Sequence, residues 1–238
     1  MMKLTIAALL VAIVGAMTLP AFADETVTIG GAQAVLIKPK GAAKGSIILM
    51  AGGNGLLNIG PKGSIGSLKG NQLVRTRHDY AARGFAVLVP DANVDVAAAV
   101  TYMAAIAKPV TLAGTSRGTQ RAAEGIAAGA RPDALVLTSG FLSPQSGERV
   151  NRHVIRLVGG SPSVLPRTLV VHHRHDGCRH TLPAGVQPFL DWSKGKATVA
   201  WLDGGINRGD PCEAGGPHGF NGLDAQVVDV VTKFAVAR

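Results

Sequence analysis

Short apolar runs alternate with segments of helical spacing along most of the chain. A hairpin is expected over residues 27–37, because Gly30 and Gly31 interrupt an apolar stretch there. Further strands are expected at 45–50, 85–89, 109–113, 133–138, 168–172 and 197–202, and helices at 72–83, 96–107, 117–128, 183–193 and 225–235. Most of these strands lack the alternation of apolar and polar residues that is typical of a strand with one exposed face. The pattern predicts an α/β protein: a mostly parallel sheet with helices on both faces, in a three-layer sandwich.

The first 23 residues have the composition of a secretory signal peptide. Lys3 gives a short positive start, residues 4–19 are almost all apolar or small, and 21–23 reads Ala-Phe-Ala, the small-x-small spacing of a cleavage site. We expect cleavage after Ala23 and export of residues 24–238 as one domain, secreted or periplasmic. An uncleaved anchor is the alternative, but the apolar run is short for a membrane span and no later segment is long enough for one.

The chain is basic, with 24 Lys and Arg against 15 Asp and Glu and a formal net charge of +9. The basic residues are scattered, without a dense run and without interleaved aromatic residues. Such a distribution favours a solvated surface over a nucleic-acid site. We therefore expect a small-molecule substrate and no nucleic-acid partner, while the oligomeric state stays open.

Residues 114–118 read Gly-Thr-Ser-Arg-Gly and lie between the strand at 109–113 and the helix at 117–128. In a sharp strand–turn–helix, glycines on both sides leave room for a serine whose hydroxyl is lifted to the end of the sheet. The N–H of Arg117, at the start of the helix, can then stabilise an oxyanion. The alternative is an ordinary Gly-Ser turn. We interpret Ser116 as a catalytic nucleophile.

A nucleophilic serine needs a base and an orienting acid, which in such a strand order follow it along the chain. Asp176 comes just after the strand at 168–172, and His218 lies in a glycine-rich loop before the last helix. Asp203, Asp210 and Asp191 compete for the role of the acid. Asp176 is preferred, because it stands at the expected strand end.

The chain has two cysteines, Cys178 and Cys212, and in an exported protein such a pair favours a disulfide. The bond would tie the loop of Asp176 to the loop of His218. Its closed loop of 34 residues would contribute about 3.5–4 kcal/mol by chain-entropy arguments. The alternative is that the disulfide only stabilises the fold, and the two roles are compatible.

A second oxyanion donor is expected from the glycine cluster at 52–55, directly after the strand at 45–50. Gly53 or Asn54 is the expected N–H donor, although such a cluster alone can also be a turn. Four histidines near the acid invite a metal site, but packing and hydrogen bonding around Asp176 fit them better, and neither a metal nor a cofactor is expected. These histidines are His172, His173, His175 and His180.

The ordered set of Ser116, Asp176 and His218, together with the glycine loop, resembles the α/β-hydrolase superfamily over nearly all of residues 24–238. The resemblance implies a sheet of eight strands or slightly fewer and acyl transfer through an acyl-enzyme. The glycine loop lacks the histidine of the HGGG motif, and only residues 58–70 and 140–166 could form a lid.

The expected activity is that of a serine hydrolase, carboxylesterase-like, acting on an ester, thioester or amide carbonyl. A degenerate hydrolase kept as a binding protein is the alternative, as is a peptidase or acyltransferase with the same triad.

Overall fold

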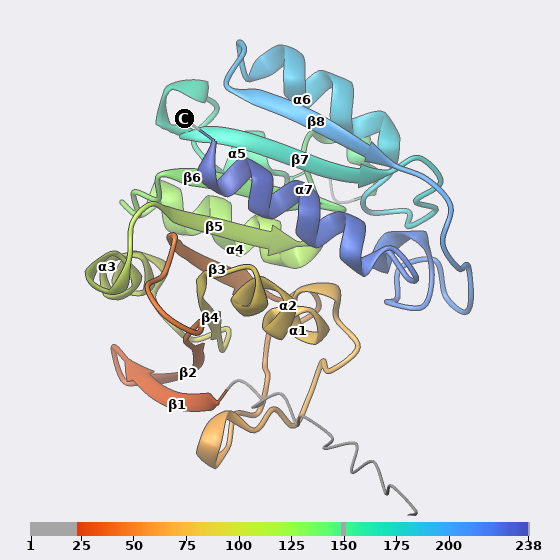
Figure 1. Cartoon of the computed structure of the whole chain (residues 1–238). Coiled ribbons are helices and arrows are strands. Elements are labelled where there is room, and N and C mark those ends of the chain that lie inside the picture. The colour runs from red at the N-terminus through yellow and green to blue at the C-terminus, as the bar shows by residue number, and fades with distance from the viewer. Residues whose placement is uncertain (1–22, 149–150, 238) are drawn as a thin grey trace, which may run out of the picture.

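An eight-stranded sheet forms the centre of the computed structural model, which describes residues 23–148 and 151–237 (Figure 1). The strands lie in the order β1-β2-β4-β3-β5-β6-β7-β8. β1 and β2 form an antiparallel hairpin and β2 is antiparallel to β4, whereas all the other neighbours are parallel. The strands are β1 (Asp24–Ile29), β2 (Ala32–Ile37), β3 (Ser46–Met50), β4 (Ala86–Pro90), β5 (Val110–Thr115), β6 (Ala134–Thr138), β7 (Arg167–His173) and β8 (Ala197–Leu202).

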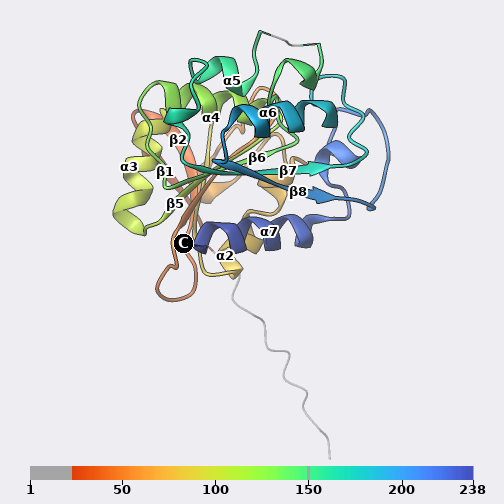
Figure 2. The same cartoon turned by 90° about the horizontal axis from the view of Figure 1, so that it is seen from above.

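Helices cover both faces of the sheet, as the unalternating strands predict (Figure 2). One face packs against α3, α4, α5 and α6, and the other against α1, α2 and α7. In β3 the side chains alternate between the two cores: Ile48 and Met50 pack on one side, Ile47 and Leu49 on the other. The helices are α1 (Gln72–Arg75), α2 (Arg77–Ala82), α3 (Val96–Ile106), α4 (Arg117–Ala127), α5 (Val154–Leu157), α6 (Val186–Trp192) and α7 (Asp224–Val236).

The predicted helix at 72–83 is wrong in one respect, because the structure divides it into α1 and α2. The break lies at Thr76, whose backbone has φ −92° and ψ 4°. The Thr76 hydroxyl donates to the carbonyl of Gln72 at 2.7 Å, a local bond that competes with a regular helix. α1 therefore ends after about one turn, and α2 begins as a separate helix.

The helix predicted at 183–193 begins with a 3₁₀ turn, η4 (Pro183–Gly185), before α6. The two segments that could form a lid, 58–70 and 140–166, also contain short 3₁₀ turns. These are η1 (Pro61–Gly63) in the first, and η2 (Pro144–Ser146) and η3 (Pro162–Val164) in the second.

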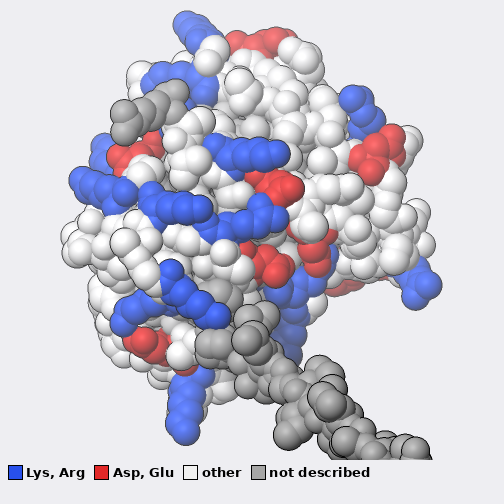
Figure 3. Space-filling view, viewed as in Figure 1, with Lys and Arg blue, Asp and Glu red and all other residues white. Residues whose placement is uncertain are grey.

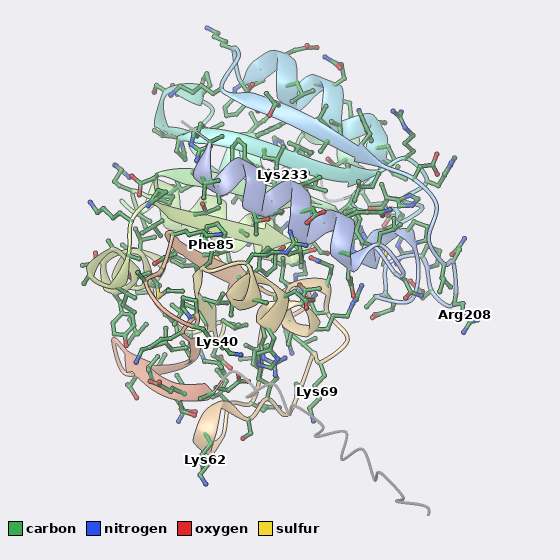
Figure 4. The ribbon with its side chains drawn as sticks, viewed as in Figure 1. Lys40, Lys62, Lys69, Phe85, Arg208 and Lys233 are labelled. Carbon is green, nitrogen blue, oxygen red and sulfur yellow. A yellow bond between two sulfur atoms is a disulfide. The ribbon has the colours of Figure 1, made fainter. Side chains whose placement is uncertain are left out.

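Basic side chains lie beside acidic ones over the face that carries α2 and α7 (Figure 3). Arg75 pairs with Asp224 at 2.7 Å, and Arg83 pairs with Asp229. Elsewhere Lys62 and Arg208 project from two separate loops (Figure 4).

The predicted signal peptide lies outside the described residues except for Ala23. β1 begins at Asp24, whose carboxylate pairs with Arg77 at 3.1 Å and with His78 at 2.5 Å. No helix within the described ranges is long and apolar enough to cross a membrane.

Candidate active site

Ser116 forms the tight turn between β5 and α4 and has a strained backbone, with φ 51° and ψ −124°. Its N–H donates to the carbonyl of Thr138 at 3.0 Å. A side chain on Gly114 would place a Cβ 2.6 Å from the carbonyl oxygen of Gly118, and one on Gly118 would overlap the carbonyl of Met50. The flanking glycines are therefore required by the close approach of α4 to β3 and β5.

Asp176 and His218 are joined by a hydrogen bond, with 3.0 Å between Oδ2 and Nδ1. Asp176 follows β7, and His218 lies in η5 (Pro217–Gly219), the turn before α7. Both residues are buried. Since a carboxylate can only accept, Nδ1 carries the hydrogen and Nε2 keeps its lone pair.

The three competing carboxylates have other partners. Asp203 lies 3.4 Å from His175, Asp210 accepts from the N–H of Cys212, and Asp191 accepts from Gln187.

Thr181 completes the hydrogen bonding between the acid and the histidine. Its hydroxyl donates to Asp176 Oδ2 at 3.1 Å and lies 3.0 Å from His218 Nδ1, whose single hydrogen it can share with Asp176. Thr181 is fully buried. The N–H of Cys178 donates to the other carboxylate oxygen, Oδ1, at 2.9 Å. The carboxylate is therefore held through both of its oxygens.

The His218 loop is fixed at its backbone as well. The hydroxyl of Ser139, which follows β6, donates to the carbonyl of His218 at 2.8 Å. The guanidinium of Arg75 donates to the carbonyl of Gly219 at 2.7 Å and to the carbonyl of Gly70 at 2.6 Å. Arg75 thus joins the His218 loop to the chain that leads into α1.

Cys178 and Cys212 form the predicted disulfide, with their Cα atoms 4.5 Å apart. Cys178 is two residues beyond Asp176, and Cys212 lies in the loop that leads to His218. The bond therefore ties the two loops covalently beside their hydrogen bond.

Ser116 and His218 line one cavity of about 230 Å³ at the ends of the parallel strands. No hydrogen bond joins the two side chains in the described part of the chain; such contacts often tighten only when a substrate binds. The rest of the lining comes from the glycine loop, the chain leading into α1 and the loop after β8: Gly52, Gly53, Leu68, Gly70, Asn71, Gln72, Thr115, Cys212, Glu213, Ala214 and Gly219. None of the described residues of 140–166 belongs to this lining.

Of the two predicted donors on the glycine loop, Gly53 lines the cavity and Asn54 does not. The side chain of Asn54 instead accepts from the N–H of Leu56 at 3.0 Å. Arg117 is the first residue of α4, so its N–H has no partner within the helix. Arg121, one turn further along α4, donates to the carbonyl of Ala51 and holds the glycine loop against the helix.

The four histidines near the acid differ in their surroundings. His172 is fully buried, and its ring lies 5.8 Å from that of Trp201. Its Nδ1 donates to the carbonyl of His173 at 3.2 Å, and its Nε2 lies 4.0 Å from Asp176 Oδ2. His173 is also buried, and its Nε2 lies 3.0 Å from the carbonyl of Gly204. No group of three or more residues suited to a metal occurs within the described ranges.

Several residues that hold the site together could not be predicted from the sequence. Thr181, Ser139 and Arg75 were not singled out, because each acts through a partner distant in the sequence. The one available indication was that Ser139 directly follows a predicted strand, at the edge where the candidate residues gather.

No protein-family model matches the chain, and no curated protein matches it at a significant level. Among solved structures, an esterase from Pyrococcus furiosus is 13% identical over 90% of this chain and 88% of its own, with a TM-score of 0.62. An esterase from Exiguobacterium antarcticum is 10% identical over 90% of this chain and 99% of its own, with a TM-score of 0.59. A third structure, Est1E from Butyrivibrio proteoclasticus, is 15% identical over 89% and 97%, with a TM-score of 0.58. At these identities the likenesses show a shared fold.

Burial of His172 predicts a loss of stability in acid. Burial is the main cause that lowers the pKa of His172, and the nearby Asp176 carboxylate only partly opposes it. Below about pH 6.5, His172 binds a proton in the unfolded chain but stays neutral in the folded chain. The free energy of unfolding therefore falls as the pH falls, by up to about 1.4 kcal/mol per pH unit. We expect His172→Gln to make urea unfolding less pH-dependent between pH 7.5 and pH 5.

His175→Gln is the matched control, because the side chain of His175 is 71% exposed. This variant should keep the pH dependence of the unchanged protein. An unaltered slope in His172→Gln would contradict the prediction.

Proposed function

We propose that this chain, which has the α/β-hydrolase fold, is a serine hydrolase that cleaves an ester-type carbonyl through an acyl-enzyme. Ser116 is the nucleophile, His218 the general base and Asp176 the orienting acid. The observation that carries the proposal is the 3.0 Å hydrogen bond between buried Asp176 and His218, at the cavity that Ser116 also lines. The esterases among the similar structures support an ester substrate over other carbonyl compounds.

Acylation begins when His218 Nε2 takes the proton of the Ser116 hydroxyl. Ser116 Oγ bonds to the carbonyl carbon, and the π electron pair moves to the carbonyl oxygen. The N–H groups of Arg117 and Gly53 donate to that oxyanion. When the carbonyl reforms, the bond to the leaving alcohol breaks and the alcohol takes the proton from His218.

Deacylation repeats these steps with water. His218 takes a proton from a water molecule, and the oxygen of that water bonds to the acyl carbon. The bond to Ser116 Oγ then breaks, Ser116 regains a proton from His218, and the carboxylic acid is released. Asp176 keeps the imidazole in one orientation and stabilises its protonated form through both steps.

The cavity favours a small acyl substrate. Its volume of about 230 Å³ is below the roughly 300–1,000 Å³ typical of pockets for drug-sized ligands. Glycines make up much of the wall near Ser116, which allows the backbone to approach the substrate closely.

Ser116→Ala should abolish turnover, since no other hydroxyl takes its place in the mechanism. We expect kcat on short-chain aryl esters to fall about 10⁴-fold or more, with an unchanged unfolding midpoint. A fluorophosphonate probe should label the unaltered protein and fail to label the variant.

Ser161→Ala, at an exposed serine, is the control and should keep full activity and labelling. Full turnover in Ser116→Ala would exclude the mechanism. An unlabelled native protein that is nevertheless stabilised by acyl ligands would indicate a binding protein.

We further propose that Thr181 is a positioning residue that acts through His218. Thr181→Val keeps the shape but loses the hydroxyl that bonds to Asp176 and His218. Hydrogen bonds to charged groups contribute about 1.5–3 kcal/mol, so kcat should fall roughly 10- to 100-fold while KM stays the same.

Thr181→Ser restores the hydroxyl and should recover most of kcat, which a purely packing role would not predict. Thr198→Val, at an exposed threonine of β8, is the matched control. A kcat within twofold of the native value in Thr181→Val would exclude this role.

We also propose that the chain is exported with cleavage after Ala23. The disulfide and the start of β1 at Asp24 support this. Mass spectrometry of the chain from the periplasm or medium of a bacterial host should show an N-terminus at Asp24, and Ala23→Arg should block the cleavage. Uncleaved chain with reduced cysteines in the cytoplasm would contradict export.

A further inference from the structure

The side chain of Asn71 makes no hydrogen bond to α1, the helix that it precedes. It occupies the position before α1 where an asparagine normally accepts a hydrogen bond from the helix backbone. Here the side chain makes no such bond. Its Oδ1 is buried without a partner among the described residues, and its Nδ2 has no hydrogen bond within that part of the chain either.

The amide instead lies at the cavity, close to the proposed nucleophile. Asn71 and Ser116 both line the cavity. A Cβ on Gly52 would lie 3.1 Å from Asn71 Nδ2 and 3.1 Å from Ser116 Cβ. Gly52 therefore separates the amide from the serine, and its missing side chain leaves the space between them open. The next residue, Gly53, is the proposed oxyanion donor, and it lines the same cavity as Asn71 and Ser116.

The backbone of Asn71 is fixed in place. Its N–H donates to the carbonyl of Leu68 at 2.9 Å, and its carbonyl accepts from Val74 and Arg75 at 3.0 and 2.9 Å. The guanidinium of Arg75 then links the preceding residue, Gly70, to the His218 loop. With the backbone fixed, only the rotations of the Asn71 side chain have to be restricted when its amide meets a substrate.

We propose that the side chain of Asn71 is a third oxyanion donor, whose Nδ2 hydrogen-bonds to the carbonyl oxygen of the substrate as negative charge develops on it. The inference rests on the proposed function. The backbone donors Arg117 and Gly53 bind the same oxygen, and Asn71 adds a donor that can be removed by substitution. Because the charge is greatest in the transition state, the contact raises kcat more than it lowers KM.

Two variants test this role. Asn71→Ala removes the amide, and kcat on short-chain aryl esters should fall about 10- to 100-fold with KM within about twofold. Asn71→Asp keeps the shape but places a carboxylate beside the developing charge, so its loss in kcat should be at least as large. The affinity for an alkyl boronic acid, which forms a tetrahedral anionic adduct with the serine, should fall in Asn71→Ala by the same factor as kcat/KM.

Asn93→Asp, at an exposed position in the loop after β4, controls for the added charge and should leave kcat and KM unchanged. An Asn71→Ala kcat within twofold of native, or a loss confined to KM, would overturn the inference. If Asn71→Ala does not fold, Asn71→Asp tests the role in its place. A kcat within twofold of native in that variant, or a loss confined to KM, would overturn the inference.

Stoichiometric labelling of the native protein by a fluorophosphonate separates the two proposals. If the native protein labels and Asn71→Ala is fully active, the role of Asn71 fails and the serine hydrolase stands. If the native protein does not label, the proposed function itself fails.

Discussion

The hydrogen bond between His218 and Asp176 depends on bringing together two loops, one after β7 and one before α7. A buried carboxylate is tolerated only where donors surround it. Asp176 meets this condition through Thr181, the N–H of Cys178 and His218 itself. The disulfide and the Ser139 contact to the His218 carbonyl then restrict how far the two loops can separate. The geometry of the site is therefore set by several independent contacts around one pair.

The turn at Ser116 is the second feature on which the geometry of the site depends. A positive φ at a residue other than glycine costs of the order of 1–3 kcal/mol, and it persists only when its surroundings leave no alternative. Here β5 pairs with β3 and β6 on its two sides, and α4 lies so close to β3 that Gly114 and Gly118 have no room for side chains. The sheet and α4 together hold the serine in its strained conformation.

Hydrophobic patterning was sufficient to predict the strands, most helices and the three layers, because buried strands and helix faces leave a periodic record in the sequence. The order of Ser116, Asp176 and His218 predicted which loops meet, since parallel strands present their carboxyl ends at one edge. The break at Thr76 was missed because it depends on a local hydroxyl bond within a segment of helical spacing. Neither Thr181 nor Asn71 stands out in the sequence, because the contacts that bring them to the site join residues far apart in the chain.

The break at Thr76 ends α1 after about one turn and separates it from α2. Asn71, directly before α1, lines the cavity, and Arg75, the last residue of α1, donates to the His218 loop. Arg75 ties this wall to the His218 loop, and on the opposite side Arg121 ties the glycine loop to α4. Guanidinium–carbonyl bonds thus tie the chain around two parts of the cavity wall to its neighbours. These walls surround a cavity of about 230 Å³, so in the proposed reaction a short acyl group would fit better than a long one.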